Sequence, residues 1–398
     1  MKRTNLPQRP DYTNRLLDDG FVYYRDQLPN GQSQEYWTEG SCYEFSESEY
    51  RKLHKASAEL HRMYKQVLDF VIKNNRWEDL GITNPQVVQA ILCSLKQGDL
   101  DLCGRFDFAF NGGTGSPKLL EYNCDSAGMM IETKAAQSWY EDMKARGVLS
   151  SSEHHWNQLE RLLLSRWQRA AGRLQNKRVH FMWASEHQSP EDFMNTAYMQ
   201  SLAMEAGIDN NHAPLEQMDW DAQQGLIGED GSPIRAAWKG YHWEWLAYEA
   251  PELLQTVAQD NNPFHVNWIE PIWKMALSSK GMLAILWELF PDSPWLLPAY
   301  LNQNGLSQYV RKPLFGAESQ QIEIVSEAGN YQDPEPQELP WGYVYQQYYD
   351  IQAHDGQRPV VSVWMVGGQP AGLAIRESSS LVTDFYCHTL PHIILGEN

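Results

Sequence analysis

Two short runs of alternating side chains, joined by a glycine-rich turn, restrict the fold of this chain more than any other feature. The first run is Gly-Arg105-Phe-Asp107-Phe-Ala-Phe, and the second is Lys-Leu-Leu-Glu121-Tyr-Asn123. Because successive side chains of a strand point to opposite faces, the charged and amide groups share one face and the apolar groups share the other. With Asn-Gly-Gly-Thr-Gly between them, the runs predict an antiparallel hairpin over residues 104–110 and 119–123.

The polar face of this hairpin indicates a site for chemistry. If Asp107 pairs with Glu121, Arg105 stands opposite Asn123, and all four side chains project from one patch. Carboxylate and amide oxygens are hard ligands of the kind that Mg²⁺ takes, together with phosphates and water. An adjacent arginine can bind two phosphoryl oxygens at once. The alternative is an ion-pair cluster on a solvated sheet face, which leaves the consistently apolar opposite face unexplained.

Charge and composition exclude several classes of protein. The 51 acidic side chains against 32 basic ones give a net charge of −19, which argues against binding nucleic acid by neutralising phosphates. Five cysteines without a C-x-x-C spacing indicate neither a disulfide framework nor a zinc site. No signal peptide and no apolar run of bilayer length is visible. We therefore expect a cytoplasmic protein that acts on small molecules, without nucleic-acid or membrane partners.

The order of the predicted elements favours an α+β fold with mostly antiparallel sheets. Helical periodicity is clearest over residues 49–74, 132–146, 153–174, 191–206 and 279–289. Strands are predicted over residues 178–184, 343–351, 360–366 and 371–376, and the proline-rich stretch 329–340 is predicted to be a loop.

Three basic residues outside the hairpin are candidates for phosphate contacts. Lys280 lies in Ser-Ser-Lys-Gly before an apolar helix, Lys312 lies in Val-Arg-Lys-Pro, and Arg376 ends a C-terminal strand. The two commonest nucleotide-binding motifs, G-x-x-x-x-G-K-[ST] and a strand followed by G-x-G-x-x-G, are absent. A single lysine is usually a solvated surface group, but two become significant if each contacts one end of a polyphosphate.

At these residues the sequence resembles the synthetase part of glutathionylspermidine synthases, and it is most similar to their stand-alone bacterial homologues described as acid–amine ligases. The matching strings follow the family order over residues 100–390. They are Gly-Arg-Phe-Asp-Phe, Leu-Leu-Glu-Tyr-Asn-x-Asp-Ser, Glu-Pro-Ile-Trp-Lys-Met-Ala-Leu-Ser-Ser-Lys-Gly, Leu-Trp-Glu-Leu-Phe-Pro, Val-Arg-Lys-Pro, Tyr-Gln-Gln and Ile-Arg-Glu.

The resemblance implies an ATP-grasp-like fold, with the nucleotide between two sheets, and a pre-ATP-grasp-like α/β subdomain. Residues 1–398 would form a single synthetase unit with three parts. These are a helical region with the metal-binding hairpin (1–176), the α/β subdomain (177–270) and an ATP-binding lobe (271–398).

The same resemblance implies a role for each candidate residue. Arg105 and Arg376 would act on the transferring phosphoryl group, and Mg²⁺ would be held by Asp107, Glu121 and Asn123. Contacts to ATP would come from Arg105, Lys280, Lys312, Gln346, Gln347, Tyr348, Tyr349, Leu381, Val382 and Thr383. Contacts to the two other substrates would come from Ser126, Glu191 and Asp192.

The implied activity is an ATP-dependent ligation of a carboxylate to an amine through an acyl phosphate. Glutathione or a similar peptide is the candidate acid, and a polyamine or another amine is the candidate nucleophile. One segment departs from the family pattern, because Ala317 and Glu318 stand in a loop where the family has more glycine and an arginine. A lid over phosphates benefits from positive charge. The alternative is therefore a nucleotide-binding pseudoenzyme that acts as a regulator or partner protein.

Overall fold

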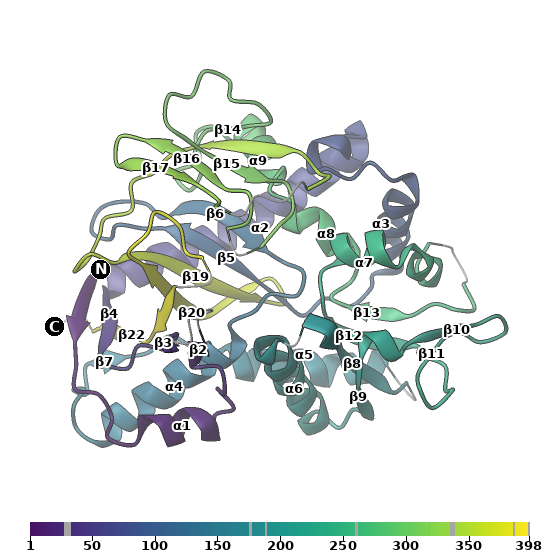
Figure 1. Cartoon of the computed structure of the whole chain (residues 1–398), viewed down its shortest axis with the longest axis horizontal. Coiled ribbons are helices and arrows are strands. Elements are labelled where there is room, and N and C mark those ends of the chain that lie inside the picture. The colour runs from purple at the N-terminus through teal and green to yellow at the C-terminus, as the bar shows by residue number, and fades with distance from the viewer. Residues whose placement is uncertain are drawn as a thin grey trace.

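The computed structural model describes residues 1–27, 33–174, 177–187, 189–258, 262–317, 319–334, 339–384 and 387–396. The predicted α+β class is confirmed, since helices and several sheets share one body (Figure 1). Within those ranges, no helix combines the length and the apolar character needed to cross a bilayer.

The predicted hairpin lies in a central five-stranded sheet in which every neighbouring pair is antiparallel. Its register is the expected one, with Asp107 opposite Glu121 and Arg105 opposite Asn123. Residues on the opposite face are buried, including Phe106. The strand order is β21 (His388–Leu390), β20 (Gln369–Ser378), β19 (Arg358–Val366), β5 (Cys103–Ala109) and β6 (Lys118–Asn123).

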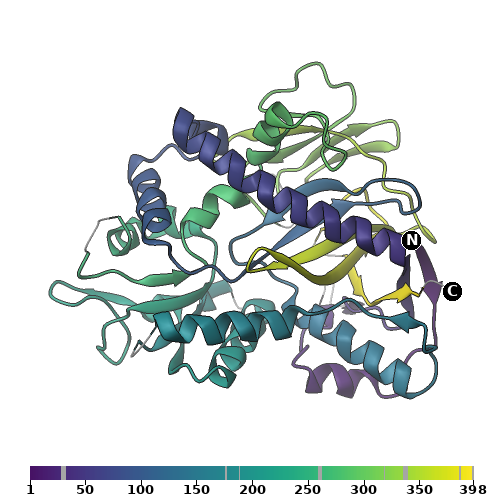
Figure 2. The same ribbon diagram turned by 180° about the vertical axis from the view of Figure 1, so that it is seen from behind.

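The long helix α2 (Glu47–Asn74) lies across the apolar side of this sheet and contacts β19 and β20 (Figure 2). It begins at a capping box, in which the Ser46 side chain accepts a hydrogen bond from the Glu49 amide and the Glu49 side chain accepts one from the Ser46 amide. It ends at Asn75, which adopts a left-handed conformation. The apolar stripe of the helix thus buries the face of the sheet that points away from the polar patch.

A second antiparallel sheet carries three more of the candidate residues, Lys312, Gln346 and Gln347. On its neighbouring strands, Val310 stands opposite Gln346, and Lys312 stands opposite Val344. The predicted loop over 329–340 is wrong at its start, because Gly329–Gln332 pairs with the preceding strand; the prolines that suggested a loop all follow residue 332, and residues 335–338 lie outside the described residues. The order is β14 (Ala299–Tyr300), β18 (Tyr343–Gln347), β15 (Tyr309–Pro313), β16 (Glu323–Ser326) and β17 (Gly329–Gln332).

A third sheet is parallel throughout, which the expectation of mostly antiparallel sheets did not include. Its strands lack the alternation that reveals half-exposed strands, and the strand Asn210–Pro214 reads Asn-Asn-His-Ala-Pro, without a continuous apolar run. The order is β13 (Asn267–Ile269), β12 (Ala236–Gly240), β8 (Val179–Trp183) and β9 (Asn210–Pro214), and the helices α5 (Leu159–Arg173) and α6 (Pro190–Glu205) pack beside it.

The remaining elements surround these three sheets. A mixed sheet contains β1 (Lys2–Asn5), β4 (Ser41–Ser46), β22 (His392–Leu395) and β7 (Glu153–His154); two-stranded ribbons are formed by β2 (Arg25–Gln27) with β3 (Ser33–Glu35) and by β10 (Asp219–Asp221) with β11 (Gly225–Ile227). The other helices are α1 (Tyr12–Asp18), α3 (Pro85–Gln97), α4 (Met130–Ala145), α7 (Trp243–Glu249), α8 (Trp273–Ser278) and α9 (Met282–Leu289).

The predicted division into three parts does not follow the sheets throughout. The parallel sheet lies inside the stretch 177–270, but the hairpin of the first part shares its sheet with β19 and β20 of the last part. Residue 176, the predicted first boundary, lies outside the described residues. The division into domains therefore stays a prediction, and the central sheet joins segments far apart in the sequence.

Candidate active site

Two cavities adjoin each other at the polar face of the central sheet. The first cavity lies between this sheet and the β14–β18 sheet, and the second opens toward the start of α6 and the loop after β12. Four residues line both cavities: Glu121, Ala317, Arg376 and Thr383. A ligand in one cavity can thus share contacts with a ligand in the other.

The structure brings every candidate residue from the sequence to one of these two cavities. The first cavity receives Asp107, Lys280, Lys312, Gln346, Gln347, Tyr348, Tyr349, Leu381 and Val382. The second receives Arg105, Asn123, Ser126, Glu191 and Asp192. Their individual roles stay predictions, but residues separated by up to 278 positions, from Arg105 to Thr383, meet at one place.

Asp107 is the most heavily hydrogen-bonded group of the site and is only 1% exposed. Arg105 donates to it from Nε (2.9 Å) and Nη2 (3.1 Å), and Arg376 Nη2 donates at 2.6 Å. The Ser362 hydroxyl and the Asn123 amide also donate to this carboxylate, at 2.7 and 3.2 Å. The strand register explains the arrangement, because Arg105 and Asp107 lie on one face of β5, and Ser362 faces Asp107 across the β5–β19 pair.

Glu121 lies at the boundary between the cavities. Its Oε1 accepts a hydrogen bond from Asn123 (3.0 Å), and its Oε2 lies 3.2 Å from the Lys280 ammonium. Burial alone would raise the pKa of Glu121, but the ammonium groups of Lys280 and Lys312 outweigh burial and lower that pKa below its usual range. The group is therefore an anion at neutral pH, ready to bind a cation.

The ammonium of Lys312 is held at the other side of the first cavity. It donates to the side-chain oxygen of Gln346 (2.8 Å) and to the Leu120 carbonyl (3.0 Å). Burial lowers the pKa of Lys312 to about 8, although Glu121 acts to raise it. Lys312 thus carries positive charge at neutral pH and loses it in mildly alkaline solution.

The Nε atom of Arg376 is a buried hydrogen-bond donor without an acceptor in the part of the chain that the structure describes. Burial opposes the charge of this guanidinium, but Asp107 and Glu121 raise its pKa, so it stays protonated. A buried and unpaired N–H is costly, and the side chain that carries it lines both cavities.

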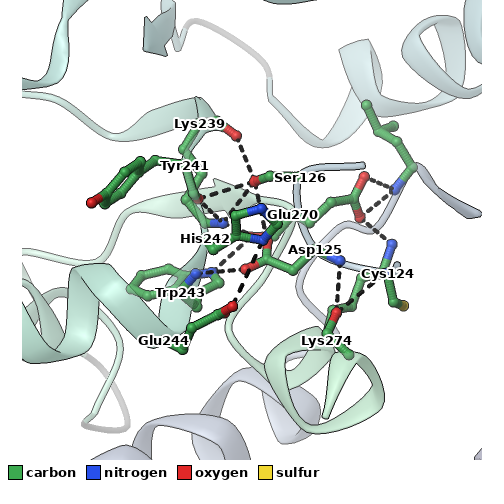
Figure 3. Close-up of polar contacts among 12 residues, drawn as sticks. Cys124, Asp125, Ser126, Lys239, Tyr241, His242, Trp243, Glu244, Glu270 and Lys274 are labelled. Atoms are coloured by element: carbon green, nitrogen blue, oxygen red, sulfur yellow. Dashed lines mark hydrogen bonds and ion pairs between the residues drawn. The ribbon is translucent and has the colours of Figure 1, made fainter. Parts of the chain in front are cut away.

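Ser126 belongs to a network that the sequence did not reveal (Figure 3). Its hydroxyl lies 3.1 Å from the Lys239 carbonyl and 3.0 Å from the Tyr241 carbonyl. Ser126 has a positive φ of 55°, and these contacts hold it in that conformation. Because its hydroxyl already bonds the protein, the expected contact of Ser126 with substrate stays a prediction.

A fully buried ion pair supports this turn. The Lys239 ammonium lies 2.5 Å from Asp125 Oδ1 and also donates to the Tyr241 carbonyl at 2.8 Å. The other Asp125 oxygen accepts from the Trp243 amide at 2.6 Å (Figure 3). Asp125 has a weak sequence signal because it follows Asn123 by two residues. Lys239, which is 114 residues away, has none.

The same network contains a second group with the composition of a metal site. Ligand atoms of Asp125, His242 and Glu244 lie within 4.8 Å of one another. However, Lys239 and Asp125 are fully buried together, so a cation could reach Asp125 only by breaking a buried ion pair. Asp107 and Glu121 also have cationic partners, but together with Asn123 they line the two cavities, where a ligand can enter. They are therefore the better candidates for a metal.

Sequence reasoning also missed a tyrosine wall of the second cavity. The hydroxyls of Tyr23 (3.2 Å) and Tyr36 (3.0 Å) both donate to the buried carboxylate of Glu132. These contacts join segments that are 109 and 96 residues apart. No local pattern near either tyrosine points to a cavity.

The loop after Lys312 borders both cavities. Ala317 lines both cavities, so a longer side chain at this position would reach them. Glu318 lies outside the described residues. The effect of its charge therefore stays a hypothesis.

Comparisons with known proteins find ligases and synthetases of one family. The family described as glutathionylspermidine synthase preATP-grasp matches residues 3–395. A Haemophilus influenzae protein provisionally named an acid–amine ligase is 31% identical over 98% of this chain and 99% of that protein. The bifunctional glutathionylspermidine synthetase/amidase of Escherichia coli is 26% identical over 92% of this chain, which spans only 60% of that relative's length.

Among solved structures, an apo glutathione synthetase-like effector from Globodera pallida superposes with a TM-score of 0.55. The match covers 96% of this chain and 95% of that one at 10% sequence identity. At so low an identity, the likeness supports the fold and nothing further.

Proposed function

The chain belongs to the glutathionylspermidine synthase family, as its sequence strings predicted, and on that premise we propose that it is an ATP-dependent ligase that joins a carboxylate to an amine. The observation that carries the proposal is the pair of adjoining cavities that share Glu121 and Arg376. A ligase that activates one substrate with ATP needs a nucleotide site that opens onto a substrate site.

The first cavity has the composition of a nucleotide site. Aliphatic side chains such as Leu297 and Ile322 offer apolar walls for a base, and the amide and tyrosine groups of 346–349 offer polar contacts at its edge. Lys280 and Lys312 stand at the end near Glu121, where a phosphate chain would lie. We infer that the nucleotide phosphates point toward the shared wall.

The residues at that wall fit a magnesium ion. Asp107, Glu121 and Asn123 offer two carboxylates and one amide oxygen within a single hydrogen-bonded group, which is the hard oxygen donor set that Mg²⁺ takes. Bound there, Mg²⁺ would neutralise negative charge on the phosphate oxygens of ATP. Lys280, whose ammonium lies 3.2 Å from Glu121, and Lys312 would add positive charge near the same phosphates.

The reaction that we propose has two steps. A carboxylate oxygen of the acid attacks the γ-phosphorus of ATP, which gives an acyl phosphate and ADP. The amine nitrogen then attacks the acyl carbon, the bond to phosphate breaks, and the nitrogen loses a proton as the amide forms. Arg105 and Arg376 lie beside this position and would spread the charge that develops on the phosphoryl oxygens.

The second cavity suits substrates of opposite kinds. Glu191, Asp192 and Asp384 line it with Glu121, which favours an amine that carries positive charge, such as a polyamine. Arg105 and Arg376 line the same cavity and suit the carboxylate of an acid. Glutathione or a similar peptide is the acid that we propose, by analogy with the family.

Release of ADP from Mg-ATP tests this function. The purified protein would be assayed against combinations of acids (glutathione, short peptides, amino acids) and amines (spermidine, putrescine, amino acids). Release that requires one acid and one amine together, and that is lost in Arg105→Ala but kept in the exposed Arg161→Ala, supports the ligase. Tight ATP binding without such release would instead favour the nucleotide-binding pseudoenzyme. The departure from the family pattern at Ala317 would then be the first explanation to test for the missing turnover.

A further inference from the structure

One glycine of the second cavity touches both the arginine and the acidic residue that the proposed reaction needs. The carbonyl oxygen of Gly128 accepts a hydrogen bond from Arg105 Nη1 at 2.8 Å. A Cβ atom placed on Gly128 would lie only 2.5 Å from Glu191 Oε1, far closer than van der Waals contact allows. The carboxylate of Glu191 therefore occupies a space that no residue other than glycine leaves open.

The backbone does not require this glycine. Gly128 lies outside the left-handed region in which many other glycines of the chain are found, so an alanine would fit its conformation. The close atom is the far end of a flexible side chain, which can move away at little cost to the fold. The missing side chain is thus explained by the position of Glu191 and not by a turn.

The surroundings of Glu191 suit the ammonium group of an amine. Tyr23 and Tyr36 line the same cavity and lie close enough to Glu191 for its charge to help raise their pKa values, after burial as the main cause. Both hydroxyls donate to the buried Glu132 carboxylate, so two aromatic side chains and the acidic group of Glu191 line this cavity together. Aromatic faces and a carboxylate together favour a cation.

We propose that Gly128 is a positioning residue that sets the amine-binding carboxylate of Glu191 beside the guanidinium of Arg105. This inference rests on the proposed ligase function and deepens it. The carbonyl of Gly128 holds Arg105, and the carboxylate of Glu191 lies against the α-carbon of Gly128. Gly128 thus sets the distance between the phosphoryl group and the nucleophile. A methyl group at this position would move Glu191 while leaving the carbonyl contact with Arg105 in place.

Steady-state kinetics with spermidine as the amine test this proposal. Gly128→Ala should lower kcat/KM for spermidine by about ten- to a hundredfold, because a displacement near 1 Å has effects of that size, while the KM for Mg-ATP changes less than about twofold. The control is Gly172→Ala, an exposed helical glycine with nothing within 4 Å of its added Cβ. Shortening the acidic side chain in Gly128→Ala/Glu191→Asp should restore part of the lost activity.

Two results would overturn the proposal: unchanged kcat/KM for spermidine in Gly128→Ala, or an equal loss when Gly128→Ala is added to Glu191→Ala, where no carboxylate remains to be displaced. If the wild type shows no amine-dependent turnover, the proposed function fails separately. The positioning role is then judged by the Kd of spermidine measured calorimetrically, and equal Kd values for wild type and Gly128→Ala would refute it.

Discussion

Two lysine–carboxylate pairs lie near each other at the edge of the central sheet, and they differ in what surrounds them. Lys239 and Asp125 are fully buried, and the carboxylate and ammonium bond only protein groups. Lys280 and Glu121 line a cavity, and the Glu121 side chain is 25% exposed. A lysine–carboxylate pair therefore links the parallel sheet to the central sheet at Lys239 and Asp125, whereas the same kind of pair faces a ligand site at Lys280 and Glu121.

The difference shows how a cavity can be lined by charged groups while the adjacent buried pair keeps the fold stable. We call the buried pair Lys239–Asp125 the closed pair and the cavity-lining pair Lys280–Glu121 the open pair. Asp125 follows Asn123 by two residues, so the closed pair anchors the end of β6, the strand that carries Glu121. Breaking a buried pair costs far more than the pair contributes, because one charge is left without a partner. We therefore expect stability effects at Lys239 and binding effects at Glu121 and Lys312.

The largest effect is expected at the closed pair. Lys239→Met leaves the Asp125 carboxylate buried and unpaired, which should lower the free energy of unfolding by about 3–5 kcal/mol. Urea denaturation followed by circular dichroism measures the change. Lys65→Met, on the exposed face of α2, should stay within about 0.5 kcal/mol of wild type, and a similarly small change at Lys239 would refute the closed role.

At the open pair, we expect loss of ligand binding with the fold intact. Glu121→Gln keeps the size of the side chain and its hydrogen bond with Asn123 but removes the charge that would hold a cation. The affinity for Mg-ADP should fall by about 10- to 100-fold, while binding of ADP in EDTA changes little. Calorimetric titration of both ligands decides, with the exposed Glu141→Gln as the matched control; equal Mg-ADP affinity would remove Glu121 from the metal site.

The pKa of Lys312, about 8, predicts a weaker dependence on pH. As pH rises from 7 to 9, the ammonium loses its proton and Mg-ADP affinity should fall about tenfold. Lys312→Arg, which stays charged, should flatten this profile. Stability should change in the opposite sense, because a lysine whose folded pKa is lowered makes the free energy of unfolding rise between pH 8 and 10.5.

The smallest effect is expected at Ser126, which contacts the Lys239–Asp125 pair and lines the second cavity. Ser126→Ala removes the hydroxyl that contacts the Lys239 and Tyr241 carbonyls, which should cost about 1 kcal/mol of stability. Mg-ADP affinity should not change, because Ser126 lines only the second cavity. A clear loss of nucleotide binding in thermal-shift titrations would assign Ser126 to the open region instead.

The sequence predicted those parts of the molecule in which each residue has a local reason for its position. Alternation and a glycine-rich turn predict the hairpin and its polar face, whereas the pairing of Asp107 with Glu121 also depends on a β-bulge between Asp107 and Phe108 that the local pattern does not show. Lys280, Lys312 and Arg376 were candidates for phosphate contacts from their local sequence, and the family resemblance implied their roles. Their meeting at one wall needed the tertiary structure. Lys239 and the tyrosine wall gave no signal, because a buried lysine or tyrosine looks like a surface one in a single sequence.

The path of the central sheet also sets when the site can form during synthesis. Ser362 and Arg376, which hold Asp107, follow it by 255 and 269 residues. At roughly 5–20 residues per second, a ribosome needs tens of seconds to make that interval. Until then the hairpin lacks its neighbouring strand β19 and presents an open strand edge with paired acidic groups. The nascent chain therefore depends on other contacts, or on a chaperone, to keep that edge from pairing wrongly before its last strands arrive.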